Sequence, residues 1–329
     1  MRSNPAVRRR VLASFLSCAL LAPVLSAHAG SYPDRPIKII VPFTAGGTSD
    51  VLARTVAEQL ALDLGQAVVV ENRAGAGGAL GAGVVARAEP DGYTLLMGSS
   101  SALAVNPGLF SNLPYDAEKS FAPISMVAGI QNILLVNPSI PVKSVQELVA
   151  YGRTHPLFFA SAGTGSSPHM SAELFQALSG LKMTHVPFKG GPQALSEVIS
   201  GRVNLVFDNM PTAAAMVKSG QLRGLGVTGA ARSPMVPDIP TIASQGLDGY
   251  DVTVWYGLVA PAGTPQPVIE LLSGEVAKIL ARPGIRAKLT EIGTEPASSS
   301  PQDFKAFISA ERKKWGEVIK KTGVKVEQG

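Results

Sequence analysis

The sequence is poor in cysteine and in long apolar runs. Its single cysteine, Cys18, lies in an apolar stretch near the N-terminus, so the rest of the 329-residue chain has no thiol for a disulfide, a nucleophile or a cysteine–zinc site. Beyond residue 29, no segment comes near the roughly 20 apolar residues that a membrane-spanning helix requires. These absences exclude a disulfide scaffold and a thiol enzyme, and they predict a soluble mature chain.

The sequence also has little excess charge once its N-terminus is set apart. Four of the 29 lysine and arginine residues lie within residues 1–29, which leaves 25 basic and 24 acidic residues in the remainder. A nucleic-acid partner or a polybasic membrane surface needs clustered lysine and arginine, so neither is expected. The 34 glycines and 25 prolines follow no triplet period, which excludes collagen and predicts many turns.

The N-terminus has the features of an export signal. Three arginines at positions 8–10 precede an apolar run over residues 11–25, and Ala-His-Ala follows at positions 27–29. A cationic head, a short apolar core and a small-x-small end are typical of a secretory signal peptide, with cleavage expected after Ala29. A membrane anchor is disfavoured because the run is short and is interrupted by Pro23. The Sec and twin-arginine export routes both stay open.

The remainder of the chain alternates short strands with helices. Ile37–Val41 is a β-branched run, after which apolar residues recur at helical spacing until Gly65 ends the helix. The unit repeats with a strand at Phe158–Ser161 and a helix over residues 167–178. Strands that alternate with helices of about ten residues predict an α/β fold, with parallel sheets and helices on both faces.

Two longer strand-like stretches, residues 124–136 and 252–261, lie between these α/β units. We interpret them, together with residues 222–227, as crossings between two lobes, each a sheet flanked by helices. A ligand cleft is then expected between the lobes, opposite the carboxyl ends of the strands. The expected lobes are residues 30–125 with 230–329, and residues 126–229.

The loop of residues 42–50 joins a strand to a helix and contains Gly46 and Gly47. Thr48 or Ser49 can cap the helix, whose first N–H groups and positive dipole end then face the cleft. Such a helix end binds an anion without any charged side chain. A plain capped turn accounts for this loop equally well.

Two further loops carry the same kind of groups. The loop of residues 161–169 holds four hydroxyls and two glycines, with Ser167 as the expected N-cap and Pro168 at the first helical position. Three serines at positions 99–101 follow the strand expected over residues 93–97. Three hydroxyl-rich loops that end strands favour a polar ligand site over turn chemistry alone.

Catalytic, cofactor and metal motifs are absent. His169 stands where a nucleophile elbow requires glycine, and Leu80 stands where the dinucleotide fingerprint requires glycine. The three histidines beyond residue 29 lack metal-ligand spacing, and His169 is more typical of a structural hydrogen-bonder than of a base. The sequence therefore predicts no catalytic residues, no cofactor and no metal. An exported hydrolase would need a nucleophile–base pair, for which no familiar spacing occurs.

A series of ordered motifs resembles one known family from about Tyr32 to the C-terminus. They are Tyr32-Pro33-Asp34-Arg35-Pro36-Ile37, residues 42–50, Val70-Glu71-Asn72-Arg73-Ala74-Gly75, Pro90-Asp91-Gly92-Tyr93, Asn106-Pro107, Leu113-Pro114-Tyr115-Asp116, residues 160–165, His185-Val186-Pro187-Phe188-Lys189-Gly190-Gly191, Phe207-Asp208-Asn209 and Ala260-Pro261-Ala262-Gly263-Thr264-Pro265. The chain resembles the Bug-type periplasmic solute receptors, which are similar to the extracytoplasmic subunit of tripartite tricarboxylate transporters. The resemblance implies a two-lobed periplasmic binding protein (Venus flytrap, type II) that closes on a small carboxylate, an organic acid or acidic amino acid. It also implies a periplasmic monomer that serves membrane transporter subunits.

The resemblance further implies which groups hold the carboxylate. They are backbone amides of residues 42–50, which we call the first loop, and hydroxyls and amides of residues 161–169, which we call the second loop. The contacts carried over from one lobe are Phe43, Ala45, Gly46, Gly47, Ser49 and Asp50. Those from the other lobe are Ser161, Thr164, Gly165, Ser166, His169, Lys189, Gly190 and Asp208, with Ser99 and Ser100 at the base.

The two acids in this set also have a simpler interpretation, because an acid near a helix start favours the dipole. For Asp50 we favour a role in the cleft, since the second end of the ligand must meet something. Lys189 can instead offer a point charge to a distal carboxylate. The sequence leaves open whether the ligand is an amino acid, a dicarboxylate or an aromatic acid, and whether the receptor serves a transporter or a sensor kinase.

Overall fold

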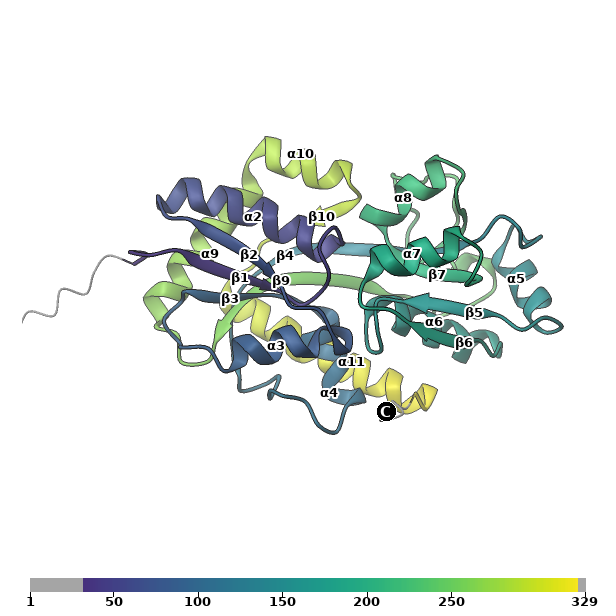
Figure 1. Cartoon of the computed structure of the whole chain (residues 1–329), viewed down its shortest axis with the longest axis horizontal. Coiled ribbons are helices and arrows are strands. Elements are labelled where there is room, and N and C mark those ends of the chain that lie inside the picture. The colour runs from purple at the N-terminus through teal and green to yellow at the C-terminus, as the bar shows by residue number, and fades with distance from the viewer. Residues whose placement is uncertain (1–31, 325–329) are drawn as a thin grey trace, which may run out of the picture. The chain divides into compact units, whose positions relative to one another are not determined.

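The computed structural model describes residues 32–324, and its strands form one ten-stranded mixed sheet (Figure 1). The strands are β1 (Ile37–Val41), β2 (Val68–Asn72), β3 (Thr94–Ser99), β4 (Phe121–Val136), β5 (Phe158–Ser161), β6 (Thr184–Pro187), β7 (Leu205–Asn209), β8 (Arg223–Val227), β9 (Thr253–Pro261) and β10 (Thr294–Pro296). Their order is β2-β1-β3-β9-β4-β7-β5-β6, and both β8 and β10 pair with β4 beside this path.

Helices connect and cover these strands. They are α2 (Thr48–Leu64), α3 (Ala79–Ala86), α4 (Asn106–Leu109), α5 (Val145–Gly152), α6 (Ser167–Ser179), α7 (Gly191–Ile199), α8 (Met210–Lys218), α9 (Gln266–Ala281), α10 (Pro283–Glu291) and α11 (Pro301–Thr322), with short turns η1 (Ala76–Gly78), η2 (Ser101–Val105) and η3 (Ala243–Gln245). In Figure 1, α2 and α10 lie on one side of the strands β1, β3 and β9, and α3 and α4 lie on the other. The predicted α/β class is confirmed.

The parallel pairing predicted for the strand–helix units is confirmed, whereas the strands in the middle of the sheet are antiparallel. β1 runs parallel to β2 and β3, and β5 runs parallel to β6 and β7, as expected for strand–helix–strand units. β9 is antiparallel to both β3 and β4, and β4 is antiparallel to β7 and β8. Strands joined by a crossover helix run parallel. β9 follows an irregular segment over residues 228–252 and not a crossover helix, so it is free to run antiparallel.

The strand β4 belongs to two groups of strands. Its first part pairs with β9 as far as Gln131, opposite Thr253, and its last part pairs with β7 from Asn132, opposite Asn209. We call β1, β2, β3, β9 and β10 the first strand group, and β5 to β8 the second. The predicted boundaries of two lobes at residues 126 and 229 stay a prediction.

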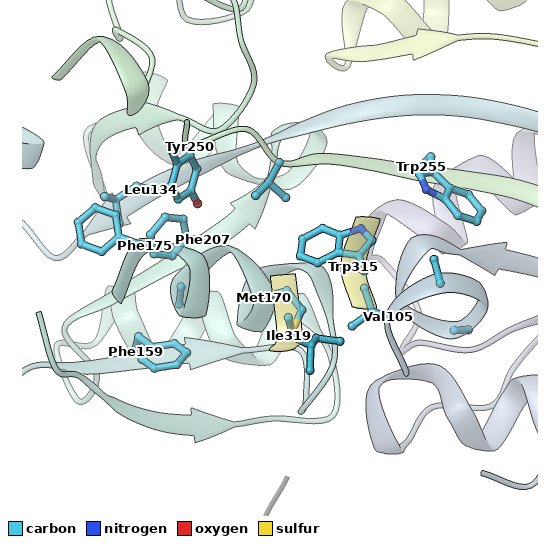
Figure 2. Close-up of a cluster of buried hydrophobic side chains, with 14 of the residues drawn as sticks. Val105, Leu134, Phe159, Met170, Phe175, Phe207, Tyr250, Trp255, Trp315 and Ile319 are labelled. Atoms are coloured by element: carbon cyan, nitrogen blue, oxygen red, sulfur yellow. The ribbon is translucent and has the colours of Figure 1, made fainter. Parts of the chain in front are cut away.

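Aromatic side chains fill the core on both parts of β4. Phe175, Phe207 and Tyr250 pack together, with ring centroids 5.6 to 6.5 Å apart (Figure 2). Trp255 on β9 packs edge-on against Phe304 at 5.7 Å. The helix α11 contacts η2, α4 and α6 as well as β4, so it packs on elements that precede and follow this strand. The core therefore continues along β4 and supports both strand groups.

The predicted export signal, its cleavage after Ala29 and Cys18 lie outside the described residues. Among residues 32–324, no helix is long and apolar enough to cross a membrane. From Arg35 onwards the described residues form one unit.

Candidate functional site

A pocket of about 420 Å³, its open mouth included, lies at the carboxyl ends of β1, β5 and β7. Its lining comes from the loops after β1 and β5, the end of β7, the starts of α2, α6, α7 and α8, and one residue of β9. The lining residues are Phe43, Thr44, Gly47, Thr48, Ser49, Ala162, Ser166, Ser167, Pro168, Gly191, Asp208, Asn209, Thr212 and Tyr256. The pocket thus joins residues of both strand groups.

Four helices begin at this pocket. The N-caps of α2, α6, α7 and α8 are Gly47, Ser166, Gly190 and Asn209, and none of these caps accepts a side-chain hydrogen bond from its own helix. Residues of the first turn of each helix line the pocket. Because the N-terminal end of a helix carries partial positive charge and N–H groups without helical partners, this arrangement favours an anion.

The structure corrects both predicted N-caps. Gly47, and neither Thr48 nor Ser49, caps α2, while Ser166 caps α6 in place of Ser167. Each helix starts one or two residues earlier than the hydroxyl pattern suggested. The side chains expected to cap the helices consequently belong to the first turns, where they are free to face the pocket.

Three hydroxyls of the pocket are buried without a hydrogen-bond partner among the described residues. They are Thr48 Oγ1, Ser49 Oγ and Ser166 Oγ, on residues that are 4%, 2% and 1% exposed. A buried hydroxyl without a partner is costly, and such groups in a folded protein call for an explanation. Three of them around one pocket indicate a site that is completed by a polar ligand.

Asp50 holds the first loop and does not line the pocket. Its Oδ2 accepts hydrogen bonds from the Gly46 N–H and from Arg54 Nε, both at 3.0 Å, and its Oδ1 accepts one from Asn72 Nδ2 at 2.9 Å. Asn72 Nδ2 also donates to the Phe43 carbonyl at 3.0 Å. Burial raises the pKa of the Asp50 carboxyl, but the hydrogen bonds from its three donors outweigh burial and hold that pKa below its usual value.

Neutral groups hold the second loop. Ser161 Oγ accepts from the Gly163 N–H at 3.1 Å and lies 2.6 Å from His185 Nε2, to which its own proton can be donated. The Gly165 N–H donates to His169 Nδ1 at 3.2 Å, which leaves His169 Nε2 to carry a proton. Burial and the neighbouring His169 lower the pKa of His185 to about 3.

The contact between Ser161 and His185 is a serine–histidine pair that no sequence spacing predicted. Ser161 is fully buried, neither residue lines the pocket, and a histidine with a pKa near 3 is a poor base at neutral pH. The His185 ring stacks on Phe159 at 4.8 Å. We assign this pair a structural role in the second loop.

Asp208 is the acid that faces the pocket. It is 2% exposed, and Thr212 Oγ1 donates to its Oδ2 at 2.5 Å. Burial raises the pKa of Asp208 to about 6, although hydrogen bonds from Thr212 and from the Asn209 backbone act in the opposite direction. Burial and the charge of Asp208 also raise the pKa of the Tyr256 phenol, whose hydroxyl donates to Asn209 Oδ1 at 2.9 Å.

The structure brings together only part of the predicted site. The predicted residues that line the pocket are Phe43, Gly47, Ser49, Ser166 and Asp208. Thr164 and Lys189 line a more open groove with Gly75 and Phe110, and this groove adjoins the pocket at Ala162. The predicted residues that line neither space are Ala45, Gly46, Asp50, Ser99, Ser100, Ser161, Gly165, His169 and Gly190.

Several of these predicted residues lie directly behind or beside the pocket. Ser99 ends β3, and its Oγ accepts from the Ala102 N–H at 3.2 Å, while Ser100 is buried at the start of η2. Gly190 leaves no room for a Cβ, because Thr44 Oγ1 occupies that position. The backbone of Thr164 blocks a Cβ at Gly77 in the same way. The loops of the two strand groups therefore touch each other around the pocket.

Nine lining residues were not among the predicted contacts: Thr44, Thr48, Ala162, Ser167, Pro168, Gly191, Asn209, Thr212 and Tyr256. Asn209 was detectable, since asparagine between a strand and Pro211 is a common N-cap. Tyr256 was not, because it lies in the middle of β9 and reaches the pocket through strand pairing. Among residues 32–324, no cluster of three or more histidine, cysteine or acidic residues could hold a metal ion.

Known proteins of one family match this chain over most of its length. The model of the tripartite tricarboxylate transporter family receptor matches residues 52–324. BugT of Bordetella pertussis is 36% identical over 320 residues, which cover 96% of this chain and 98% of BugT. The structure of Rpa4515 of R. palustris with adipate has 38% identity and a TM-score of 0.87, and it covers 89% of this chain and 99% of its own. MatC from Rhodopseudomonas palustris with bound malate has 33% identity and a TM-score of 0.83, covering 88% and 100%.

These matches confirm the predicted family and the periplasmic-binding-protein fold. They also remove the exported hydrolase from consideration, because the family consists of solute-binding receptors and not of enzymes. The chain belongs to the tripartite tricarboxylate transporter receptor family of periplasmic solute-binding proteins.

Proposed function

We propose that this receptor captures a small carboxylate in the pocket between the loops after β1, β5 and β7. The observation that carries the proposal is the set of three buried hydroxyls without partners, at a point where four helices begin. A carboxylate accepts hydrogen bonds from hydroxyls and from backbone N–H groups, and the helix ends offset its charge without a cationic side chain. The relatives crystallised with adipate and malate support an organic acid as the ligand.

We further propose that the protein is exported by the signal in residues 1–29, with cleavage after Ala29, and acts as a monomer of two lobes divided near residues 126 and 229. Its partner in this proposal is a tripartite tricarboxylate-type transporter. A receptor that reports to a sensor kinase would have the same pocket. Uptake of a labelled ligand distinguishes the two, because deletion of a transport receptor lowers uptake whereas deletion of a reporting receptor changes only the response.

The ligand class is tested with a thermal-shift panel of mono- and dicarboxylates, acidic amino acids, aromatic acids, sugars and cations. A ligand that binds only the folded state at about 100 times its Kd adds roughly 2.7 kcal/mol of stability. We expect shifts from acids alone. A reproducible shift with a sugar, while every acid is silent, would overturn the proposal.

A pair of glycine variants tests whether binding uses this pocket. Gly190 has φ −175°, which any residue adopts, so Gly190→Ala strains no backbone and acts only through the overlap of its Cβ with Thr44. We expect it to weaken acid binding at least tenfold, because the loops can no longer approach each other. The control Gly274→Ala adds a Cβ in open space on α9 and is expected to bind as the wild type does. Equal affinities for the two variants would place the ligand elsewhere.

A further inference from the structure

We propose that Asp208 takes part in the binding site as a neutral carboxylic acid, so that capture of a carboxylate takes up one proton from solvent. The inference rests on the proposed function, because it describes how one pocket accommodates an anionic ligand beside a buried acid.

A carboxylate bound in this pocket would share it with Asp208 and with no cationic side chain. Asp208 lies in the same small space as the free hydroxyls of Ser49 and Ser166, where the ligand carboxylate is expected. The lining contains no lysine, arginine or histidine. Among the described residues, none of these cationic types lies within 4.0 Å of the Asp208 carboxylate as an ion-pair partner. Ionisation of both carboxylates in one buried site has a high free-energy cost, so one of them takes a proton.

Thr212 can hydrogen-bond to Asp208 in either protonation state, although the bond that it donates favours the ionised form. Thr212 Oγ1 lies 2.5 Å from Asp208 Oδ2 and 3.0 Å from the Asn209 carbonyl oxygen. A hydroxyl has one proton to donate and can also accept one. When Asp208 is ionised, Thr212 donates to it. When Asp208 is protonated, it can donate to Thr212 Oγ1, and the Thr212 proton then goes to the Asn209 carbonyl.

The other titratable groups around Asp208 do not supply this proton. Tyr256 on β9 is its direct electrostatic neighbour, with a phenol whose pKa is raised by burial, so Tyr256 stays neutral. His185 on β6 has a pKa of about 3 and is also neutral. His169 Nδ1 on α6 accepts from the Gly165 N–H, and its Nε2 lies 3.4 Å from Glu173 Oε1. Lys189, which precedes α7, lines the adjoining groove and not the pocket.

The proton balance sets the direction of the pH dependence. Below the pKa of Asp208, near 6, the free receptor already carries the proton and binds the anion directly. Above it, the receptor must take one proton from solvent for each anion bound, so the apparent affinity falls as the pH rises. The fraction of free receptor with a protonated Asp208 is about one half at pH 6 and about 1% at pH 8. The affinity is therefore expected to be about 50-fold lower at pH 8 than at pH 6.

The test compares the wild type with Asp208→Asn, using the acids of the thermal-shift panel as probes at pH 6, 7 and 8. Asparagine is close in shape to the neutral acid and does not titrate. We therefore expect the affinity of the variant to differ little among the three pH values. Any titration of the ligand itself persists in the variant, so the ratio of the two proteins' affinities at each pH removes it. At pH 7.5, calorimetry in two buffers of different ionisation enthalpy should report close to one proton taken up by the wild type and none by the variant.

Thr212→Val provides a second variant should Asp208→Asn fail to fold. It removes the hydroxyl that favours the ionised acid, so the midpoint of the pH dependence should move upward by about half to one pH unit. Three results overturn the inference alone: the same pH dependence in Asp208→Asn as in the wild type, an affinity that rises with pH, or a midpoint that Thr212→Val leaves in place. No binding by any acid at any pH overturns the proposed function, and the inference falls with it.

Discussion

The loops after β1 and β5 have the same place in the fold and nearly the same composition, but they are held by different chemistry. Each runs from a strand to a helix, contains two glycines and presents a buried free hydroxyl to the pocket, on Ser49 and Ser166 respectively. An ionised carboxylate, Asp50, ties the first loop to Arg54 and Asn72. In the second loop the same task falls to the uncharged pair of Ser161 and His185 and to His169.

This difference teaches that one pattern of glycine and hydroxyl residues does not determine how a binding loop responds to pH. The first loop depends on a group whose pKa is lowered, so it is expected to withstand mild acid. The second depends on a half-buried histidine, His185, that must stay neutral, so mild acid works against it. Acidification should therefore weaken the second loop before the first.

The largest expected effect comes from Asp50→Ala. The change leaves the Gly46 N–H without its acceptor and removes one of the two acceptors of Asn72 Nδ2, and we expect the free energy of unfolding to fall by about 3 kcal/mol. Urea unfolding of the wild type and the variant measures this fall. The matched variant Arg54→Gln removes a half-exposed partner and should cost less than about 1 kcal/mol. If the two variants cost the same, the ion pair and not the backbone contact holds the loop.

The next prediction concerns the pH at which each loop loses its contribution to stability. His185 has a native pKa of about 3 and an unfolded value near 6.5, so between these values the unfolded state binds the extra proton and stability falls as the pH falls. From pH 7 to pH 5 the wild type should lose about 2 kcal/mol more than His185→Phe, which keeps the stacking on Phe159.

The contribution of Asp50 to the free energy of unfolding should change little between pH 7 and pH 5. Its native pKa lies below its unfolded value of about 3.9, so its contribution is present above that value and is lost only as the pH falls through the lower native pKa. Urea unfolding of the wild type, His185→Phe and Asp50→Ala at pH 7 and pH 5 separates the two loops. A wild type and a His185→Phe variant that respond alike to pH would contradict the comparison.

The smallest expected effects come from removing one free hydroxyl from each loop. Ser49→Ala and Ser166→Ala should each weaken binding of an acid about fivefold, or about 1 kcal/mol, through loss of a single neutral hydrogen bond. Neither should lower stability, because neither hydroxyl has a partner among the described residues. Calorimetry of both variants, with the exposed Ser219→Ala as control, measures the effects. A loss confined to Ser49→Ala would mean that the first loop alone holds the carboxylate.

The local units could be predicted from the sequence because their causes are local. The run Ile37–Val41, the apolar spacing that follows it and the stop at Gly65 define β1 and α2, and Gly65 indeed has φ +65° at the end of α2. The place of the loop of residues 42–50 at the strand's carboxyl end could be predicted for the same reason, whereas Phe43, Gly47 and Ser49 were expected as contacts because of the family resemblance. The one-residue error at Ser166 arose because several adjacent hydroxyl residues are equally good N-caps.

The remaining features depend on partners distant in the sequence. Whether Asp50 faces the pocket was undecidable locally, because Asn72, which binds its Oδ1, comes from the end of β2. The direction of β9 and the arrival of Tyr256 at the pocket follow from pairing with β3 and β4. Asp50 and Asp208 looked alike as acids near helix starts, yet one has its pKa lowered and the other has it raised to about 6.

The sequence by itself determined the class of the protein, the order of its strands and helices, and the hydroxyl-rich loops that end the strands. These follow from residue periodicity, from glycine and proline positions and from motif order, all of which act over a few neighbouring residues. Only the tertiary structure decided which hydroxyls stay free, which acid is ionised and which residues meet at the pocket. The physical reason is that hydrogen-bond saturation and desolvation depend on every group within a few ångströms of a side chain, and in this pocket those groups come from β1, β5, β7 and β9 together.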